Sequence, residues 1–175
     1  GFGALKYLAG RPDIDSGKIG VMGFSFGANM TLRMASKAVS EAFLPNADDP
    51  RFAAHAPFYP SCWVFMNARD YGTLTGAPVL LFAGGQDDYE TSSDACKKFL
   101  DALPESTRSH MALQFYPDAT HGWDTRKSEP FTISDRYAFG GRGGLVRFNP
   151  DPAIAEDSRG RAVAFFTRVL KPARN

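Results

Sequence analysis

Three residues that together can perform nucleophilic acyl chemistry follow one another along the chain as serine, aspartate and histidine. Ser25 stands between two glycines in Gly23-Phe24-Ser25-Phe26-Gly27, after an apolar β-type segment and before a helical pattern at 28–35. A serine at such a strand-to-helix junction is typical of a nucleophile elbow, in which a strained turn holds Oγ clear of the sheet. The sequence therefore predicts that Ser25 is a nucleophile, and that the residues two before and two after it must be small.

A serine hydroxyl needs a general base, and the chain has three histidines. His121 lies in a loop directly after the strand-like segment 110–115, where open α/β sheets place their chemistry. His55 lies within an apolar segment and is expected to be a hydrogen-bonded core histidine. His110 begins a strand and is expected to face solvent. His121 is therefore the candidate base.

The acid that orients the histidine should follow an earlier strand, because the triad order of this architecture is serine, acid, histidine. The unbroken apolar run 78–83 predicts a parallel strand buried on both faces, and it ends in Gly84-Gly85-Gln86-Asp87-Asp88. Either Asp87 or Asp88 could accept a hydrogen bond from the imidazole. Asp88 could equally serve the start of the helix that follows.

Taken together, the elbow, the Gly-Gly-x-Asp turn and His121-Gly122 resemble the dienelactone hydrolase branch of the α/β-hydrolases. The resemblance covers nearly all of the chain except about 125–148. It implies that Asp87 is the triad acid and that the N–H of Phe26, the residue after the nucleophile, is one oxyanion donor. Dienelactone hydrolases proper carry cysteine where this chain has Ser25. This departure shifts the expected reaction from dienelactone opening towards general ester hydrolysis.

The resemblance also implies that part of the fold precedes this sequence. In the family, several strands come before the elbow strand, and one of their loops supplies the second oxyanion N–H. We therefore expect a missing N-terminal segment, or a companion chain, that completes the sheet. Without it the elbow strand would lie at an exposed sheet edge.

Strands alternate with helices along the chain, which predicts the α/β class with a mostly parallel sheet covered by helices on both faces. We expect one α/β-hydrolase domain over 1–175, incomplete at its N-terminus, with a loop insertion near the active site at 125–148. The expected helices span 1–10, 27–40, 92–103 and 157–170, and the expected strands span 18–23, 52–58, 78–83 and 111–116.

Composition argues against several classes of partner. The net charge is +1 and the pI about 8.0, and the sequence has no run of basic residues. It therefore lacks the clustered positive charge that nucleic-acid binding requires. No apolar stretch approaches the ~20 residues needed to span a bilayer. The cysteines and histidines lack the spacing of metal ligands, and the inferred chemistry needs no cofactor.

The two cysteines, Cys62 and Cys96, follow consecutive strands of the predicted sheet, so they could meet near Asp87. A disulfide there would favour a secreted or periplasmic protein, and two buried thiols a cytosolic one. A signal peptide would lie in the absent N-terminal part, so the sequence leaves the compartment open.

The resulting hypothesis is a serine hydrolase that cleaves carboxylic esters or lactones, with Phe24 and Trp123 lining an apolar substrate pocket. Two alternatives stay open. One is a serine peptidase of the prolyl oligopeptidase type, which shares the triad order. The other is a catalytically silent fragment that acts as a binding subunit.

Overall fold

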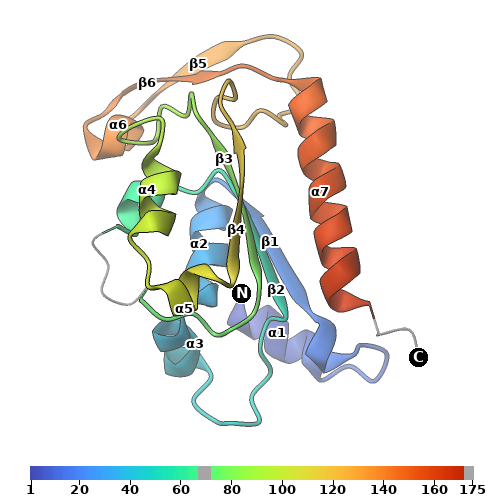
Figure 1. The fold of residues 1–175 in the computed structure, drawn as a ribbon. Helices are drawn as coiled ribbons and strands as arrows, with labels where there is room; N and C mark the ends of the chain where they lie inside the picture. Colours follow the sequence, from blue (N-terminus) through green and yellow to red (C-terminus); the bar gives the residue numbers. More distant parts are fainter. Residues whose placement is uncertain (67–71, 172–175) are drawn as a thin grey trace.

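The sheet at the centre of the molecule has four parallel strands in the order β1-β2-β3-β4 (Figure 1). The computed structural model describes residues 1–66 and 72–171. The α/β class and the parallel sheet predicted from the sequence are confirmed. The elements are, in chain order, α1 (Phe2–Ala9), η1 (Ser16–Lys18), β1 (Gly20–Phe24), α2 (Phe26–Ala35), α3 (Lys37–Phe43), β2 (Ala54–Phe58), η2 (Cys62–Val64), β3 (Val79–Gly84), α4 (Ala95–Asp101), α5 (Glu105–Arg108), β4 (Met111–Tyr116), β5 (Phe131–Asp135), α6 (Ala138–Gly141), β6 (Gly144–Phe148) and α7 (Pro152–Leu170).

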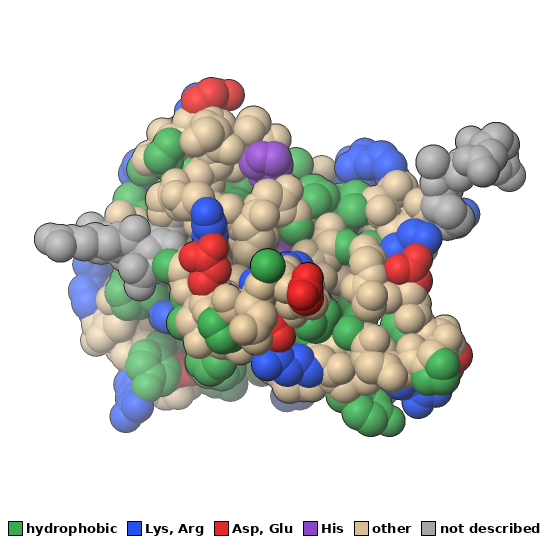
Figure 2. All heavy atoms as spheres, turned by 90° about the horizontal axis from the view of Figure 1, so that it is seen from below, with side chains coloured by type: hydrophobic (Ala, Val, Ile, Leu, Met, Phe, Trp, Pro, Cys, Tyr) green, Lys and Arg blue, Asp and Glu red, His purple; other side chains and the backbone are tan. Residues whose placement is uncertain are grey.

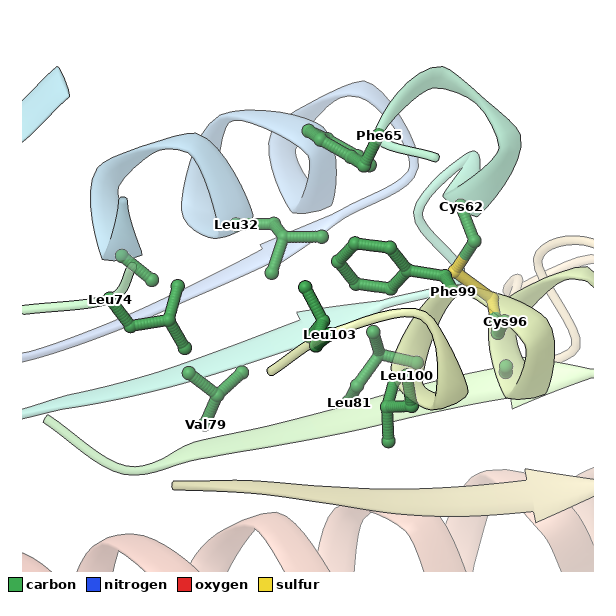
Figure 3. Packing of buried hydrophobic residues seen from close by; sticks show 12 residues of the cluster. Leu32, Cys62, Phe65, Leu74, Val79, Leu81, Cys96, Phe99, Leu100 and Leu103 are labelled. Atoms are coloured by element: carbon green, nitrogen blue, oxygen red, sulfur yellow. A yellow bond between two sulfur atoms is a disulfide. The ribbon is translucent and has the colours of Figure 1, made fainter. Parts of the chain in front are cut away.

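Helices cover both faces of this sheet, and the β3 side chains show how. Leu81 packs into a cluster with residues of α2 and α4 on one face, and Figure 3 shows Leu32, Phe99 and Leu100 of that cluster. Phe82, the next residue, packs on the other face with Phe165 of α7. Successive side chains of a strand point to opposite faces, so the apolar run of β3 has to be buried on both.

Three predicted helices have different bounds in the structure, and the one expected at 92–103 spans only Ala95–Asp101. The helix expected at 27–40 is two helices, because Ser36 adopts an extended conformation (φ −66°, ψ 131°) and its hydroxyl accepts from the N–H of Val39. The last helix begins at Pro152 rather than near 157. Its start is fixed by Asp151, whose side chain accepts a 2.9 Å hydrogen bond from the N–H of Ile154.

Residues 131–148, where the sequence analysis expects a loop, instead form a β-hairpin. Strands β5 and β6 pair antiparallel, and the short turn α6 lies between them. Phe131 and Phe148 stack at its open end with ring centroids 4.7 Å apart. The hairpin crosses above the carboxyl ends of the sheet strands and leads into α7 (Figure 1). We call residues 131–148 the hairpin below.

The elbow strand β1 lies at one edge of the four-stranded sheet, as the sequence analysis expects. Two of its side chains, Met22 and Phe24, are 48% and 42% exposed. On the face opposite the hairpin, acidic and basic side chains are interspersed (Figure 2). Among the described residues, no helix has both the length and the apolar character required to cross a membrane.

Candidate active site

Ser25, His121 and Asp87 lie in one hydrogen-bonded chain. The Nε2 atom of His121 is 2.7 Å from the Oγ of Ser25, and its Nδ1 atom is 2.8 Å from Oδ2 of Asp87. The side chains of His121 and Asp87 are almost completely buried. Each residue follows the carboxyl end of a sheet strand, β1 for Ser25, β3 for Asp87 and β4 for His121. The arrangement can take a proton from the serine hydroxyl and stabilise the imidazolium that results.

The elbow holds Ser25 in a backbone conformation that non-glycine residues rarely adopt (φ 53°, ψ −118°). The turn is so tight that a Cβ on Gly23 would lie 2.2 Å from the carbonyl oxygen of Gly27. A Cβ on Gly27 would meet no atom within 4 Å. The expectation that both positions must be small therefore holds for Gly23 within this chain, whereas Gly27 has room for a side chain.

Two glycines let the acid turn pack tightly against the histidine loop. A Cβ on Gly84 would lie 2.4 Å from the carbonyl oxygen of Ala119, and one on Gly85 would lie 2.4 Å from that of Pro117. The N–H of Gln86 donates to the Ala119 carbonyl at 2.9 Å. The two loops are thus joined backbone to backbone, which fixes the distance between Asp87 and His121.

Asp87 has both carboxylate oxygens engaged. While Oδ2 faces His121, Oδ1 accepts a 2.9 Å hydrogen bond from the N–H of Tyr89. Asp88 does not contact the histidine, because its carboxylate pairs with Arg147. Of the two aspartates left open by the residues alone, the geometry thus selects Asp87.

Three aromatic rings, none of them predicted from the sequence, enclose the imidazole of His121. The ring centroids of Tyr59, Tyr89 and Phe148 lie 4.7, 4.4 and 5.7 Å from that of His121. Burial, followed by hydrogen bonding to Asp124, raises the pKa of Tyr59, and burial with hydrogen bonding to Asp135 raises that of Tyr89. Both phenols therefore remain protonated at neutral pH and act on the histidine by packing.

A sequence signal existed for two of these rings. Tyr59 immediately follows β2 and Tyr89 lies two residues after Asp87, so both stand at the carboxyl edge of the sheet. Tyr59 also has a positive φ of 43°, which turns its chain sharply at that edge. Phe148 comes from the hairpin, and nothing in its local sequence indicates that it reaches the histidine.

The backbone N–H of Phe26 is suitably placed to serve as an oxyanion donor. Phe26 is the first residue of α2, and the N–H groups of a first helical turn have no carbonyl partner within their helix. The positive end of the helix dipole adds to this preference for negative charge. The oxyanion role of Phe26 stays a prediction.

Cavities open on both sides of Ser25. One of about 610 Å³ is bordered by His121 and by Phe24, Tyr59, Arg126, Phe131 and Phe148. Another of about 490 Å³ is bordered by Phe26, Met30, Trp63 and Tyr137. Ser25 and Tyr89 line both. Phe24 thus lies at a cavity wall, and its contact with a substrate stays a prediction.

Trp123, the other residue expected in a pocket, lies in the core instead. Its ring is buried against Tyr59 and Tyr116, and its Nε1 donates to the Oγ of Ser158 on α7 at 3.2 Å. An indole two residues after the histidine can face inward or outward, and α7, which is distant in sequence, provides both its hydrogen-bond acceptor Ser158 and apolar neighbours in the core.

Cys62 and Cys96 form a disulfide with their Cα atoms 5.0 Å apart (Figure 3). The bridge joins the start of η2 to α4, beside the buried carboxyl of Glu90. Within the described residues, these three side chains are the group of possible metal ligands whose ligating atoms lie close together. Because the two sulfurs bond to one another, they do not offer thiolate ligands in this structure.

The other two histidines are not part of the hydrogen-bonded chain formed by Ser25, His121 and Asp87. His55 is buried in β2 against the ring of Phe52, and burial lowers its pKa to about 4, an effect that a backbone contact with Met34 partly opposes. It is therefore neutral at physiological pH. His110 is exposed just before β4, as the sequence analysis expects.

Comparison with solved structures places this site in a known fold. A thermophilic esterase from the Planctomycetes species Thermogutta terrifontis, with propionate bound, superposes with a TM-score of 0.61 at 16% identity, over 99% of this chain and 65% of that one. A dienelactone hydrolase-like promiscuous phosphotriesterase from metagenomic libraries gives 0.61 at 17% identity, over 96% and 59%. An acylaminoacyl peptidase gives 0.56 at 17%, over 99% and 27%. The likeness shows an α/β-hydrolase fold.

This chain spans between about a quarter and two thirds of the length of those neighbours. No curated protein matches it significantly. The family model for the dienelactone hydrolase family matches residues 2–170, which is nearly the whole chain and includes Ser25, Asp87 and His121. The chain therefore belongs to the dienelactone hydrolase family.

Proposed function

We propose that this chain carries the catalytic centre of a serine hydrolase that cleaves carboxylic esters or lactones. The observation that carries the proposal is the hydrogen-bonded chain from Asp87 through His121 to Ser25. Membership of the dienelactone hydrolase family supports a hydrolase, and the strained backbone at Ser25 supports its role as nucleophile.

In the acylation half of the reaction, the Oγ of Ser25 forms a bond to the ester carbonyl carbon while its proton passes to Nε2 of His121. The carbonyl oxygen becomes an oxyanion, which the N–H of Phe26 stabilises. Asp87 holds the imidazole in the tautomer with hydrogen on Nδ1 and stabilises the imidazolium. His121 then returns the proton to the leaving alcohol as its carbon–oxygen bond breaks.

In the deacylation half, a water molecule attacks the acyl-enzyme while His121 takes one of its protons. The bond from the carbonyl carbon to Oγ then breaks, and His121 returns the proton to Ser25. Since the leaving alcohol must lie near Nε2 of His121, we assign it to the cavity of about 610 Å³ that borders the histidine. The cavity of about 490 Å³ on the far side of Tyr89 is then available to the acyl group.

We further propose that an additional polypeptide segment, either N-terminal to this one or from a companion chain, pairs with β1. The support is the position of β1 at the sheet edge and the exposed apolar side chains Met22 and Phe24. Such a segment would supply a second oxyanion N–H beside that of Phe26. Loss of one such donor typically costs about 10²–10³ in rate.

The test is covalent labelling with a fluorophosphonate, followed by intact-mass measurement of the protein and turnover of p-nitrophenyl esters. A single adduct on Ser25 is expected. Ser25→Ala should lose both the adduct and turnover, and Asp87→Asn should slow turnover by about 10³–10⁴. Ser109→Ala, which changes an exposed serine outside the site, is the matched control and should behave as wild type.

An adduct on another serine, or turnover that survives Ser25→Ala, would refute the proposed mechanism. If the protein cleaves peptide anilides faster than esters, its substrates are peptides and not esters. If protein that includes any companion segment is not labelled, the hypothesis of a catalytically silent binding subunit replaces the proposed function.

A further inference from the structure

The hairpin is tied to the acid turn through the residue next to Asp87. Asp88 has a side chain only 8% exposed, and it accepts three hydrogen bonds from Arg147 of β6. The backbone N–H and Nε donate to Oδ2 at 2.9 and 2.8 Å, and Nη2 donates to Oδ1 at 2.8 Å. The Arg147 side chain is itself 51% exposed, so what this forked guanidinium–carboxylate pair supplies is above all a fixed geometry, through three hydrogen bonds on one buried carboxylate.

Two further hydrogen bonds join the same turn to the hairpin. The hydroxyl of Tyr89 donates to Oδ2 of Asp135 on β5 at 2.8 Å, and the N–H of Phe139 donates to the carbonyl of Asp88 at 2.7 Å. Both residues that directly follow Asp87 therefore bind the hairpin.

At the same carboxyl end, immediately after Arg147, β6 reaches His121. Phe148, which follows Arg147, presents its ring edge-on to His121 at an interplanar angle of 89°. A Cβ on Gly122 would lie 3.0 Å from the Phe148 ring, so this contact is close. One residue further, the N–H of Asn149 donates to Oγ1 of Thr120 at 2.8 Å. The end of β6 therefore packs against the residues on either side of His121 as well as against its ring.

We propose that Arg147 is a positioning residue for the hydrolytic reaction: by binding Asp88 it fixes β6, and with it Phe148, so that the imidazole of His121 is held at the distance needed for proton transfer from Ser25. This inference rests on the proposed function. Arg147 touches neither substrate nor Ser25, and acts through the packing of Phe148. Small misplacements of a catalytic group can reduce the rate by about 10²-fold.

The kinetic test compares Arg147→Met with Arg142→Met. Arg142 is an exposed arginine on the same hairpin, so the control removes the same charge from the same element. We expect Arg147→Met to lower kcat by about 10- to 100-fold with little change in KM, and Arg142→Met to leave both unchanged. Arg147→Lys keeps the charge but cannot form the fork, and should fall between the two.

A second readout separates positioning from general loss of structure. In Arg147→Met the carboxylate of Asp88 stays buried without its counter-charge, and the added negative potential should move the acid limb of the pH–rate profile to higher pH. Asp88→Asn in the same chain removes that charge and should return the limb towards its wild-type position. The other charged or titratable groups near His121 are Asp87, Asp124, Arg126 and Asp135, together with the phenols of Tyr59 and Tyr89.

A third readout does not depend on activity. Trypsin can cleave after Arg126 and Lys127, which are exposed in the segment that precedes β5. Release of the hairpin should speed this cleavage in Arg147→Met and not in Arg142→Met. If kcat and cleavage in Arg147→Met match those of the control, the inference is overturned. If wild type and all variants lack turnover, the proposed function fails together with the catalytic part of this inference, while faster cleavage in Arg147→Met would still support attachment of the hairpin.

Discussion

Replacing the buried Glu90 by glutamine should change the pH dependence of stability in a direction that the structure fixes. The Glu90 carboxyl accepts hydrogen bonds from the backbone N–H groups of Cys62 and Trp63. Burial raises its pKa from 4.5 to about 8, the nearby charge of Asp87 adds to the rise, and the N–H donors partly oppose it. The carboxyl is therefore protonated in the folded protein at neutral pH.

A carboxyl whose pKa is raised by folding binds more protons in the folded than in the unfolded protein between the two pKa values. Its contribution to the free energy of unfolding is therefore complete below pH 4.5 and is lost as the pH rises towards about 8. At about 1.4 kcal/mol per pH unit, the interval from 4.5 to about 8 corresponds to up to roughly 5 kcal/mol.

Glu90→Gln removes the titration and keeps an oxygen acceptor for the N–H of Cys62. The assay is urea unfolding of the oxidised protein from pH 5 to pH 9. Because other groups titrate in this range, the quantity to compare is the unfolding free energy of the variant minus that of wild type. We expect this difference to increase by several kcal/mol between pH 5 and pH 9.

Glu129→Gln is the matched control, because Glu129 is exposed in the described structure. It should show a difference from wild type that stays constant with pH. Any packing cost of the new amide at position 90 is also independent of pH. A flat difference for Glu90→Gln would refute the inferred protonation of the buried carboxyl.

Two further outcomes follow from covalent and backbone geometry. The disulfide closes a loop between residues 34 positions apart, so the Cys62→Ala, Cys96→Ala double variant should lose about 4 kcal/mol in urea unfolding. An unchanged midpoint would show that the bridge does not constrain the unfolded chain. Gly23→Ala should abolish activity and lower stability, because its Cβ would collide with the Gly27 carbonyl. Gly27→Ala should preserve the fold within this chain and gain up to about 1 kcal/mol of helix propensity. Equal effects of the two substitutions, measured by thermal unfolding and ester turnover, would contradict the inferred elbow geometry.

The sheet and the three residues of the hydrogen-bonded chain were predictable because their signals are local. An apolar run followed by a turn marks each strand end, as at 78–83 before Gly84-Gly85. In a parallel sheet the carboxyl ends of neighbouring strands meet at one edge, so Ser25, Asp87 and His121 had to come near each other. The family resemblance then selected Asp87 over Asp88, as the geometry does.

The surroundings of His121 were not predictable, because they depend on contacts between segments that are distant in sequence. Phe148 lies 27 positions after His121 and reaches it only through the hairpin. The sequence predicted a loop for this segment, not two paired strands. Trp123 was expected in the pocket and lies in the core, because α7 supplies its buried partner Ser158.

By itself, the sequence determined the fold class, the sheet and the candidate triad, because hydrophobic periodicity, turn residues and the order of the strands can be recognised in short segments. Tertiary structure alone decided which aspartate pairs with Arg147, which aromatic rings enclose the histidine and which glycine of the elbow cannot carry a side chain. These depend on the distances between segments that the packed core brings together, and no local sequence pattern encodes such distances.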